Sequence, residues 1–299
     1  MIATNYTEIF ENKANDVILL ESILQPVIDE YESLQSLKKN KLGRPKSIST
    51  IKCLDIILCV LIIGLSWKRA SKYVTCSTKY KSTVHRNYLR WINAGIIKNS
   101  HSAINSKYLE LHESDVHELL IDSTDIMNEK MGRIHTYKSF KLNKQALRVT
   151  ILSTCNKKPI DYTVEPAHKP DSELGYELLM TTNLGSTDKI YIGGDTGYRM
   201  NNTKISNLRK KGLIICYVKP RKSKKKRKYK TKNYKPKHKR VRHSNKMKKC
   251  LDKRHKIEHV NSVFHRSYKR LNRVSETLVC VYDAFIQLAI CMMLLTDII

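Results

Sequence analysis

The chain has 299 residues, and its 56 lysines and arginines exceed its 27 aspartates and glutamates, which gives a formal net charge of +29. This charge is far above what solubility requires and makes a polyanion the natural partner. The eight cysteines form no CxxC pair, and neither a secretory signal nor a membrane-spanning run is expected, which argues against a secreted disulfide-stabilised domain and a membrane protein. We expect an intracellular protein, in the cytoplasm or nucleoid of a prokaryote or in the nucleus of a eukaryote.

The first part of the chain is predicted to be helical. Residues 17–37 carry apolar side chains at helical spacing and predict a long amphipathic helix, interrupted or bent near Pro26. This helix, within a segment placed at residues 1–40, either packs inside its own domain or pairs two protomers. Residues 41–98 predict a helical DNA-binding domain, and residues 99–115 predict a linker.

Three shorter helices are expected inside the DNA-binding domain. The patterns place them at residues 50–64, 66–74 and 82–94, and Ser82 and Gly95 are the expected N-cap and stop of the last one. The second and third helices carry several basic side chains and predict a reader of DNA that resembles a helix-turn-helix. Their seven-residue connection is longer than the usual short turn.

The candidate DNA contacts of this region are basic side chains. Two of them belong to a Gly-Arg-Pro-Lys stretch that either lies in a minor groove or forms a linker. The candidates are Arg44, Lys46, Lys68, Arg69, Lys72, His85, Arg86 and Arg90.

Residues 116–299 alternate between strand and helix patterns. This order predicts an RNase H-like α/β catalytic domain with a mixed sheet, preceded by the all-α DNA-binding region. The last helix is interrupted by charges too often to span a bilayer and is expected to cover the sheet. Strands are expected at residues 119–121, 146–152, 160–164, 190–192 and 213–218, and helices at residues 172–182, 202–211, 257–271 and 278–299.

Three carboxylates stand at chemically significant places in this order. Asp122 follows one apolar strand, Asp195 closely follows another, and Glu258 interrupts a helical pattern. Taken alone, each carboxylate can be explained by a structural role, as a helix cap, a turn former or a solvated charge. Together they suit two magnesium ions roughly 4 Å apart, which activate the attacking oxygen and stabilise the leaving oxygen at phosphorus. We assign the first position to Asp122 and not to Asp125, which we expect in the loop beyond the strand.

A dense basic segment separates the second and third acids. Residues 219–256 contain 21 lysines or arginines against one acid, Asp252, and so carry +20 of the net +29. Apolar periodicity is missing, which predicts a basic loop at residues 219–250 that orders on DNA and binds it in a salt-sensitive way. A nuclear-localisation signal and a solvated linker are the alternatives. The DNA-contact candidates here are Lys224, Lys225 and Arg227.

At this point the chain resembles the DDE transposases of bacterial insertion sequences, in particular the "IS five" group that is related to the eukaryotic Harbinger transposases. The resemblance rests on the three acids, on the Gly43-Arg44-Pro45-Lys46 stretch with the apolar helix after it, and on residues 81–95. It spans about residues 43 to 290.

The resemblance implies that Asp122, Asp195 and Glu258 are the DDE triad and hold Mg²⁺, with Mn²⁺ as an alternative. Such enzymes often carry a tyrosine and an arginine before the third acid and a lysine seven residues after it. Arg254 fits this pattern, whereas Leu251 and His265 depart from it. Either a nearby cation substitutes for the lysine in contacting phosphate, or the copy is degraded. The phosphate-contact candidates are Arg254, His265, Arg266 and Lys269.

These features predict a DNA transposase that cleaves transposon ends and transfers the freed 3′-hydroxyls into target DNA. Its partners are double-stranded DNA, as transposon ends and target, and at least one further copy of the chain in the DNA complex, with no membrane. A catalytically inactive DNA-binding relative and a stand-alone RNase H-like nuclease are the alternatives. Zinc is not expected, because His255 and His259 share a helical face with little help from Cys250 and lack a matching ligand pair.

Overall fold

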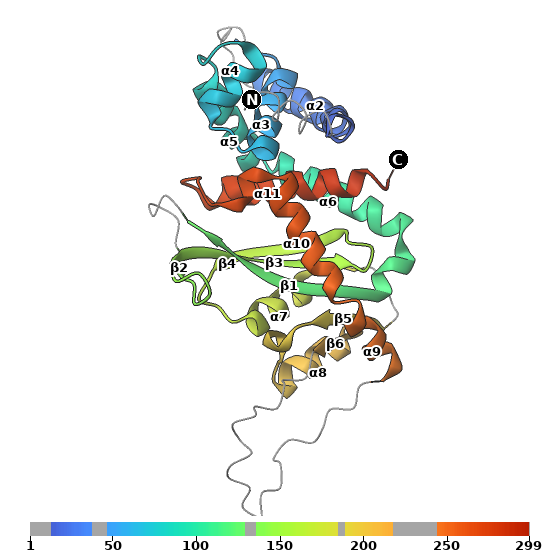
Figure 1. The fold of residues 1–299 in the computed structure, drawn as a ribbon. Coiled ribbons are helices and arrows are strands. Elements are labelled where there is room, and N and C mark those ends of the chain that lie inside the picture. Colours follow the sequence, from blue (N-terminus) through green and yellow to red (C-terminus); the bar gives the residue numbers. More distant parts are fainter. Residues whose placement is uncertain (1–12, 38–46, 129–135, 185–188, 218–243, 299) are drawn as a thin grey trace, which may run out of the picture.

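A mixed β-sheet forms the centre of the lower half of the molecule, and helices cover both of its faces (Figure 1). The computed structural model describes residues 13–37, 47–128, 136–184, 189–217 and 244–298. The six strands are β1 (Glu118–Met127), β2 (Tyr137–Lys138), β3 (Gln145–Thr154), β4 (Pro159–Pro166), β5 (Ile190–Gly194) and β6 (Leu213–Tyr217). This confirms the predicted mixed sheet.

Strand β1 occupies the middle of the sheet. The strand order is β2-β3-β1-β5-β6, with β4 also paired to β3. Strand β1 runs antiparallel to β3 and parallel to β5, which is in turn parallel to β6. Because strands pair with both of its edges, the ladders on each side fix the positions of the side chains on β1.

Strand β1 is longer than its sequence pattern suggests. We expected Asp122 to end the strand and Asp125 to lie in the following loop, and both expectations are wrong. The ladder with β3 continues as far as the pair of Met127 with Ala146, so both aspartates are strand residues. Residues three apart on a strand point to opposite faces of the sheet. The two carboxylates therefore face different surroundings.

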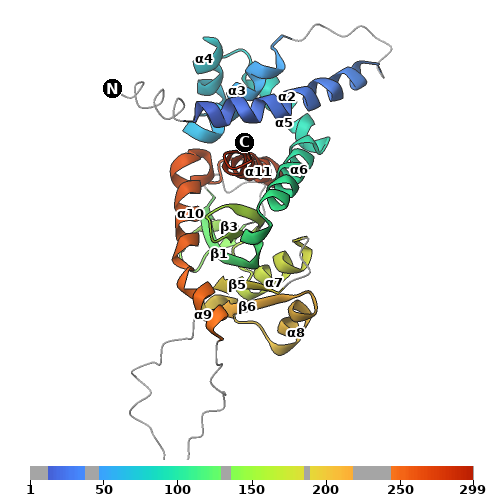
Figure 2. The ribbon, with the colours of Figure 1, turned by 90° about the vertical axis from the view of Figure 1, so that its right-hand side faces the viewer.

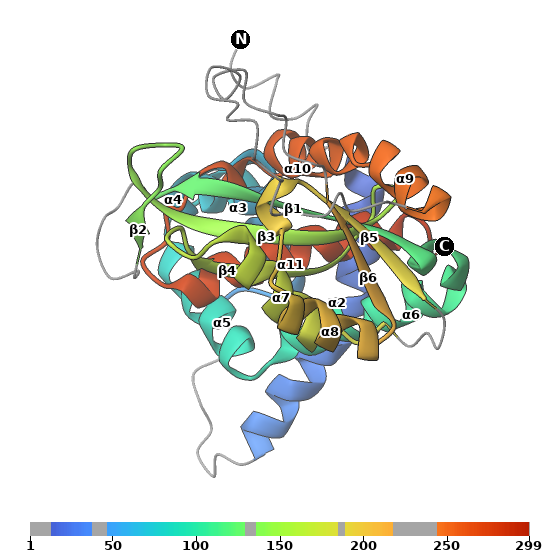
Figure 3. The ribbon, with the colours of Figure 1, turned by 90° about the horizontal axis from the view of Figure 1, so that it is seen from below.

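Among the described residues, the helices α7 (Asp171–Thr181), α8 (Asn202–Lys210), α9 (Asn245–Asp252) and α10 (His255–Ser267) accompany the sheet. Figure 3 views the sheet from the side of α7 and α8, with α9 and α10 along one side of it. The predicted helices at residues 172–182 and 202–211 are confirmed within one or two residues. The predicted helix around Glu258 is α10.

Helix α9 shortens the expected basic loop. Residues 245–250 belong to this helix, because the hydroxyl of Ser244 accepts a hydrogen bond from the Met247 amide at 3.3 Å and caps it. Cys250 is fully buried and fixes the helix to the sheet. Extending the loop to residue 250 was therefore wrong, and residues 218–243 lie outside the described part of the chain.

In the described part of the chain, the helices α2 (Ala14–Leu37), α3 (Thr50–Ile63), α4 (Trp67–Thr75), α5 (Lys81–Asn93) and α6 (Ile96–Leu111) precede the sheet. Helix α2 continues through Pro26 without a break. Helix α3 ends at Gly64, whose φ of 76° is the left-handed conformation that glycine adopts without strain. Helix α5 begins one residue early, so Ser82 lies inside its first turn and does not cap it. Gly95 separates α5 from α6, as predicted for a stop.

The stretch expected as a linker at residues 99–115 is mostly helix α6, so this expectation was wrong. Ile97, His101, Ile104 and Tyr108 recur at helical spacing and are buried. Their polar neighbours hide this periodicity in the sequence, because the buried stripe is narrow and contains a histidine. Helix α6 packs along α11 and leads from the N-terminal helices to the sheet.

Helix α11 (Val279–Leu295) lies between the N-terminal helices and the sheet (Figures 1 and 2). It packs against α2, α5 and α6 on one side and against β4 on the other, and nearly all of its side chains are buried. One continuous apolar core therefore joins the helical region to the sheet. Within the described residues, the helices are too short or too polar to traverse a lipid bilayer.

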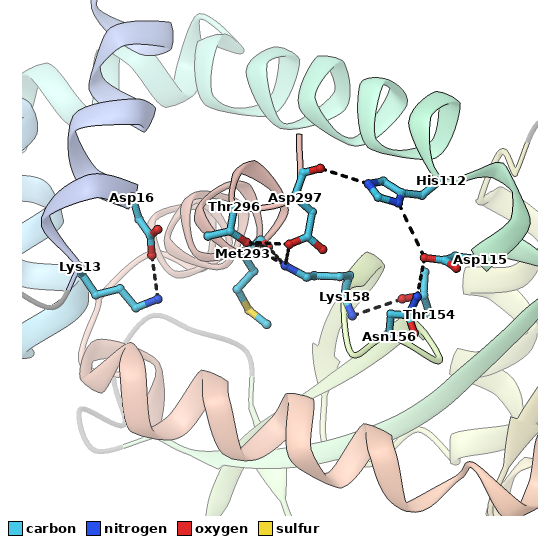
Figure 4. Close-up of polar contacts among 10 residues, drawn as sticks. All are labelled: Lys13, Asp16, His112, Asp115, Thr154, Asn156, Lys158, Met293, Thr296 and Asp297. Carbon is cyan, nitrogen blue, oxygen red and sulfur yellow. Dashed lines mark hydrogen bonds and ion pairs between the residues drawn. The ribbon is translucent and has the colours of Figure 1, made fainter. Parts of the chain in front are cut away.

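Polar contacts fix the end of α11 (Figure 4). The Lys158 ammonium, which lies at the turn between β3 and β4, donates hydrogen bonds to the Met293 carbonyl, the Thr296 hydroxyl and the Asp297 carboxylate at 2.8, 2.8 and 2.6 Å. His112, at the end of α6, contacts the Asp297 carbonyl at 3.1 Å. A cation at a helix C-terminus also interacts favourably with the helix dipole. These contacts tie α11 to α6 and to the sheet.

His101 makes the stability of this layer depend on pH. Burial lowers the pKa of His101 to about 4, because the charged ring would be held away from water. Between about pH 6.5 and 4 the unfolded chain binds a proton that the folded chain refuses, so the stability falls as the pH falls through this window. In His101→Gln, we expect the decrease in the free energy of unfolding between these pH values to be smaller by up to about 3 kcal/mol.

Urea unfolding at several pH values measures the effect, with the exposed His168→Gln as the matched control. An unchanged pH slope in His101→Gln would show that the ring is accessible to protons in the folded protein.

Candidate active site

Asp122 faces helix α10. On β1 it shares its face with Leu120, which packs in a small apolar cluster with Ile257 of α10. Its Oδ2 accepts a hydrogen bond of 3.0 Å from Nδ2 of Asn261, also on α10. The first candidate acid therefore lies on the face of the sheet that is covered by the helix carrying Glu258.

Asp125 faces the other side of the sheet and is already paired. The Arg148 guanidinium donates Nε to Oδ1 at 2.7 Å and its second nitrogen to Oδ2 at 3.1 Å, and the Ser139 hydroxyl donates to Oδ2 at 2.5 Å. Burial acts to raise the pKa of Asp125, but the hydrogen bonds from Arg148 and Ser139 outweigh it and lower the pKa. A carboxylate committed to such a pair is a structural group, which favours Asp122 as the site residue.

Asp195 follows β5 directly, at the carboxyl end of the strand beside β1. Its Oδ1 accepts a hydrogen bond of 2.6 Å from the Gly197 amide and so caps the short helix η2 (Thr196–Tyr198). Gly194, immediately before it, has no room for a side chain, because a Cβ there would lie 2.9 Å from the ring of Tyr198. The glycines of this motif thus permit the close turn that presents Asp195.

A chain of buried hydroxyls joins the two aspartates' segments. The Tyr198 hydroxyl lies 2.6 Å from the Ser123 hydroxyl, which lies 2.8 Å from that of Thr150. Ser123 is the neighbour of Asp122, and Tyr198 is three residues after Asp195. The loop after β5 is therefore held against β1, and the spacing of the two acids is set by buried groups and not by solvent-exposed ones.

The two aspartates influence each other electrostatically. Burial of the Asp122 carboxyl raises its pKa to about 6, and the Asp195 carboxylate adds to this increase. The backbone amide of Ser123 and the positive charges of Lys141 and Arg254 act in the opposite direction. A half-buried carboxylate beside a second one is costly to ionise, and a cation held between them would remove that cost. The donor set, made of carboxylate oxygens, is the type that Mg²⁺ and Mn²⁺ prefer.

Glu258 lies in the first turn of α10 and is mostly exposed, with 61% of its side chain accessible. Its Oε1 pairs with the Arg254 guanidinium at 3.3 Å, one turn earlier on the chain. Within the part of the chain that the structure describes, no three His, Cys, Asp or Glu side chains are close enough to share a metal ion. Asp122 and Asp195 thus belong to neighbouring parallel strands, on β1 and directly after β5, whereas Glu258 is paired with Arg254.

The predicted phosphate contacts near α10 are spread over its C-terminal end. Arg266 and Lys269 are exposed. The His265 ring makes a 2.9 Å hydrogen bond to the Asn272 side chain. Leu251, at the position where a tyrosine was expected, lies half-buried on α9.

The predicted DNA-reading side chains lie on α4 and α5, which are joined by the five residues 76–80. Lys68, Arg69, Lys72 and Arg86 are exposed. His85 packs edge-on against Trp67, and Arg90 pairs with Asn87 at 2.6 Å and with Glu32 at 3.8 Å, so these two are partly engaged within the protein. The remaining candidates, Arg44, Lys46, Lys224, Lys225 and Arg227, lie outside the described residues.

The comparison with known families decides the identity of the domain. The family model described as "Transposase DDE domain" matches residues 117–294, which is more than half of the chain. The chain belongs to the DDE transposase family. No curated protein and no solved structure matches it. The matched region begins at the start of β1 and ends in α11, so it contains all three candidate acids of this transposase.

The zinc alternative for this transposase involves Cys250 and the two histidines His255 and His259 on α10. Cys250 is buried, and its thiol donates to the backbone carbonyls of Leu119 and Tyr191 at 3.6 and 3.5 Å. His255 and His259 are exposed on α10, and the His255 ring contacts the Asp252 carbonyl at 3.0 Å. The cysteine and the histidines therefore point into different environments.

Three residues around the candidate acids of this transposase were not found from the sequence. Asn261 contacts Asp122, Arg148 holds Asp125, and Tyr198 fixes the loop of Asp195. Asn261 is three residues after Glu258, so a search along that helical face would have found it. Arg148 and Tyr198 left no comparable signal, because their roles depend on strand register and on a contact between distant segments.

Proposed function

We propose that this protein is a metal-dependent DNA transposase that cleaves DNA at transposon ends and transfers the freed strand into target DNA. Asp122, Asp195 and Glu258 would be the ligands of Mg²⁺ or Mn²⁺. The observation that carries the proposal is the position of Asp122 on the central strand β1, on the face that α10 covers, next to the parallel strand β5 that Asp195 directly follows. Membership of the DDE transposase family supports it.

The bound ions would supply Lewis-acid stabilisation of the attacking and leaving oxygens. Residues of the chain itself would contact the phosphate and hold the two aspartates in position. Arg254, which is within reach of Glu258 and influences Asp122, is placed to contact a phosphate once its carboxylate partner turns away. The buried Ser123 and Tyr198 hydroxyls would keep the two aspartates at a fixed spacing.

The sheet order supports an RNase H-like assignment for the catalytic domain. Strand β1 carries the first acid at the centre, the antiparallel β3 lies on one side, and the parallel β5 with the second acid lies on the other. The third acid comes from a helix that packs on the same central strand. We propose that residues 116–299 form the catalytic domain and that residues 41–98 form the DNA-binding domain.

The arrangement of the basic elements supports binding of double-stranded DNA along the molecule. Helices α4 and α5 lie at one end and α9 at the other, with α10 and the sheet between them (Figures 1 and 2). The described elements on either side of the basic segment, β6 and α9, lie at the end opposite α4 and α5. A DNA duplex that contacts α4 and α5 at one end and the basic segment at the other end would pass the three candidate acids. Synapsis of two transposon ends would require at least a dimer of this chain.

Cleavage of DNA by the purified protein tests the proposal. We expect cut and joined products when DNA flanking the reading frame is incubated with Mg²⁺ or Mn²⁺. Neither product should form without metal or with Asp195→Ala, while the exposed Asp252→Ala should behave as the parent protein. Cut DNA without joined product would indicate a nuclease. DNA binding by a folded protein without any product would indicate the inactive relative, for which Leu251 and His265 would be the first residues to restore.

A further inference from the structure

Asn261 is the residue of α10 that touches the first acid. Its Nδ2 donates to Oδ2 of Asp122 at 3.0 Å, a contact that joins α10 to the central strand. It lies three residues after Glu258, so both side chains project from neighbouring positions on the helix. Asn261 therefore contacts the first candidate acid directly and lies about one helical turn after the third.

The other end of the same amide is unsatisfied. Its Oδ1 is buried and has no hydrogen-bond partner among the described residues. Buried amide oxygens are nearly always paired, and exceptions call for an explanation. The side chain borders a small hollow of about 10 Å³, lined in part by Thr124, Phe264 and His265. This volume is close to the smallest that holds a single water molecule.

The two polar atoms of the Asn261 amide match two states of Asp122: Nδ2 suits the bare carboxylate, and Oδ1 suits a carboxylate with a bound cation. With a bare carboxylate, Nδ2 must face Asp122, because Oδ1 would repel it. With a cation on the carboxylate, a half-turn of the amide would direct Oδ1 to the cation and remove the unsatisfied oxygen. Amide oxygens are accepted ligands of hard divalent cations. One side chain can therefore hold the acid in the first state and contribute a neutral oxygen in the second.

We propose that Asn261 is a fourth protein ligand of the divalent-cation site, beside Asp122, Asp195 and Glu258. This inference rests on the proposed metal-dependent function and adds a residue to its site. A neutral ligand between acids strengthens the coordination without increasing the repulsion among the carboxylates.

Binding of Mn²⁺ to the full-length protein without DNA tests the proposal, followed by isothermal titration calorimetry and by the electron paramagnetic resonance of free Mn²⁺. We expect Asn261→Ala to weaken Mn²⁺ binding about 10- to 100-fold, the range found when groups that support a metal site are removed. Asn261→Asp should bind at least as tightly as the parent protein, because it restores an oxygen ligand. Ser262→Ala, the next residue on α10, is the matched control, and circular dichroism verifies that every variant is folded.

The aspartate variant separates a ligand from a hydrogen-bond donor. If Asn261 acts only by donating to Asp122, an aspartate cannot replace it and repels its neighbour, so both variants weaken binding and the proposal is overturned. Unchanged binding in Asn261→Ala also overturns it. If Asp195→Ala loses Mn²⁺ binding and Asn261→Ala does not, the proposed function stands and only the role of Asn261 is rejected. Absence of Mn²⁺ binding in the parent protein rejects both.

Discussion

Replacing Asp122 by asparagine is expected to abolish metal-dependent DNA cleavage and to leave the protein folded. The amide keeps the shape of the side chain but lacks the charge that a divalent cation requires, and losing one ligand of a catalytic metal site lowers the rate by about 10³-fold or more. Stability should be unchanged or slightly higher. The substitution removes a half-buried carboxyl whose pKa burial and Asp195 raise to about 6.

Asp125→Asn is the matched control, three residues along the same strand but on the opposite face of the sheet. It should keep cleavage activity in the folded fraction and lose stability, because the Arg148 guanidinium then lacks its carboxylate partner. Single-turnover cleavage with Mg²⁺ and the midpoint of thermal unfolding measure the two effects. If Asp125→Asn lost cleavage while Asp122→Asn retained it, the assignment of the first acid would be reversed.

Removing the Arg148 side chain is expected to lower the free energy of unfolding more than the other substitutions predicted for this protein. Arg148 pairs with Asp125 in a two-point contact and also donates to the Lys169 carbonyl at 2.8 Å and to Asp171 at 3.1 Å. The arginine side chain is 10% and the Asp125 side chain 3% accessible, so neither charge is solvated. Breaking such a buried pair costs about 3–5 kcal/mol, since one charge remains without a partner. Arg148→Ala should therefore unfold at a clearly lower urea concentration.

Arg148→Lys tests whether the two-point geometry matters, because an ammonium cannot reproduce a planar guanidinium contact. We expect an intermediate loss of stability. The double variant Asp125→Leu with Arg148→Met should recover part of the loss, because replacing both charges leaves no unpaired ion. A double variant as unstable as Arg148→Ala would show that the bonds to Lys169 and Asp171, and not the ion pair, carry the stability.

The sequence indicated the elements of the sheet because strands and amphipathic helices leave periodic patterns. The strand around Leu147, the helix before Thr182 and the helix of Glu258 all lie within a few residues of their predicted positions. Asp195 lies directly after a strand, as predicted, because a short apolar run ended by glycines marks a strand and a turn.

Predictions from the sequence were wrong where the burial of a residue depends on partners that are distant along the chain. The length of β1 beyond Asp122 is set by pairing with β3, which begins at Gln145, and no local pattern near Asp125 reports it. Helix α6 was missed because its buried stripe includes His101, a polar residue that only its contact with α11 and β4 accounts for. The contact of Asn261 with Asp122 joins residues 139 positions apart.

The position of α11 has a consequence for how the chain acquires its structure during translation. Helix α2 packs against α11, yet more than 240 residues separate Leu37 from the start of that partner. At about 5–20 residues per second, ribosomes would leave the apolar face of α2 without this partner for roughly 10–50 s. The N-terminal helices therefore cannot complete their packing as an early folding unit. A fragment that ends before α11 should be prone to aggregate, and the nascent protein should depend on chaperones until residue 295 has been made.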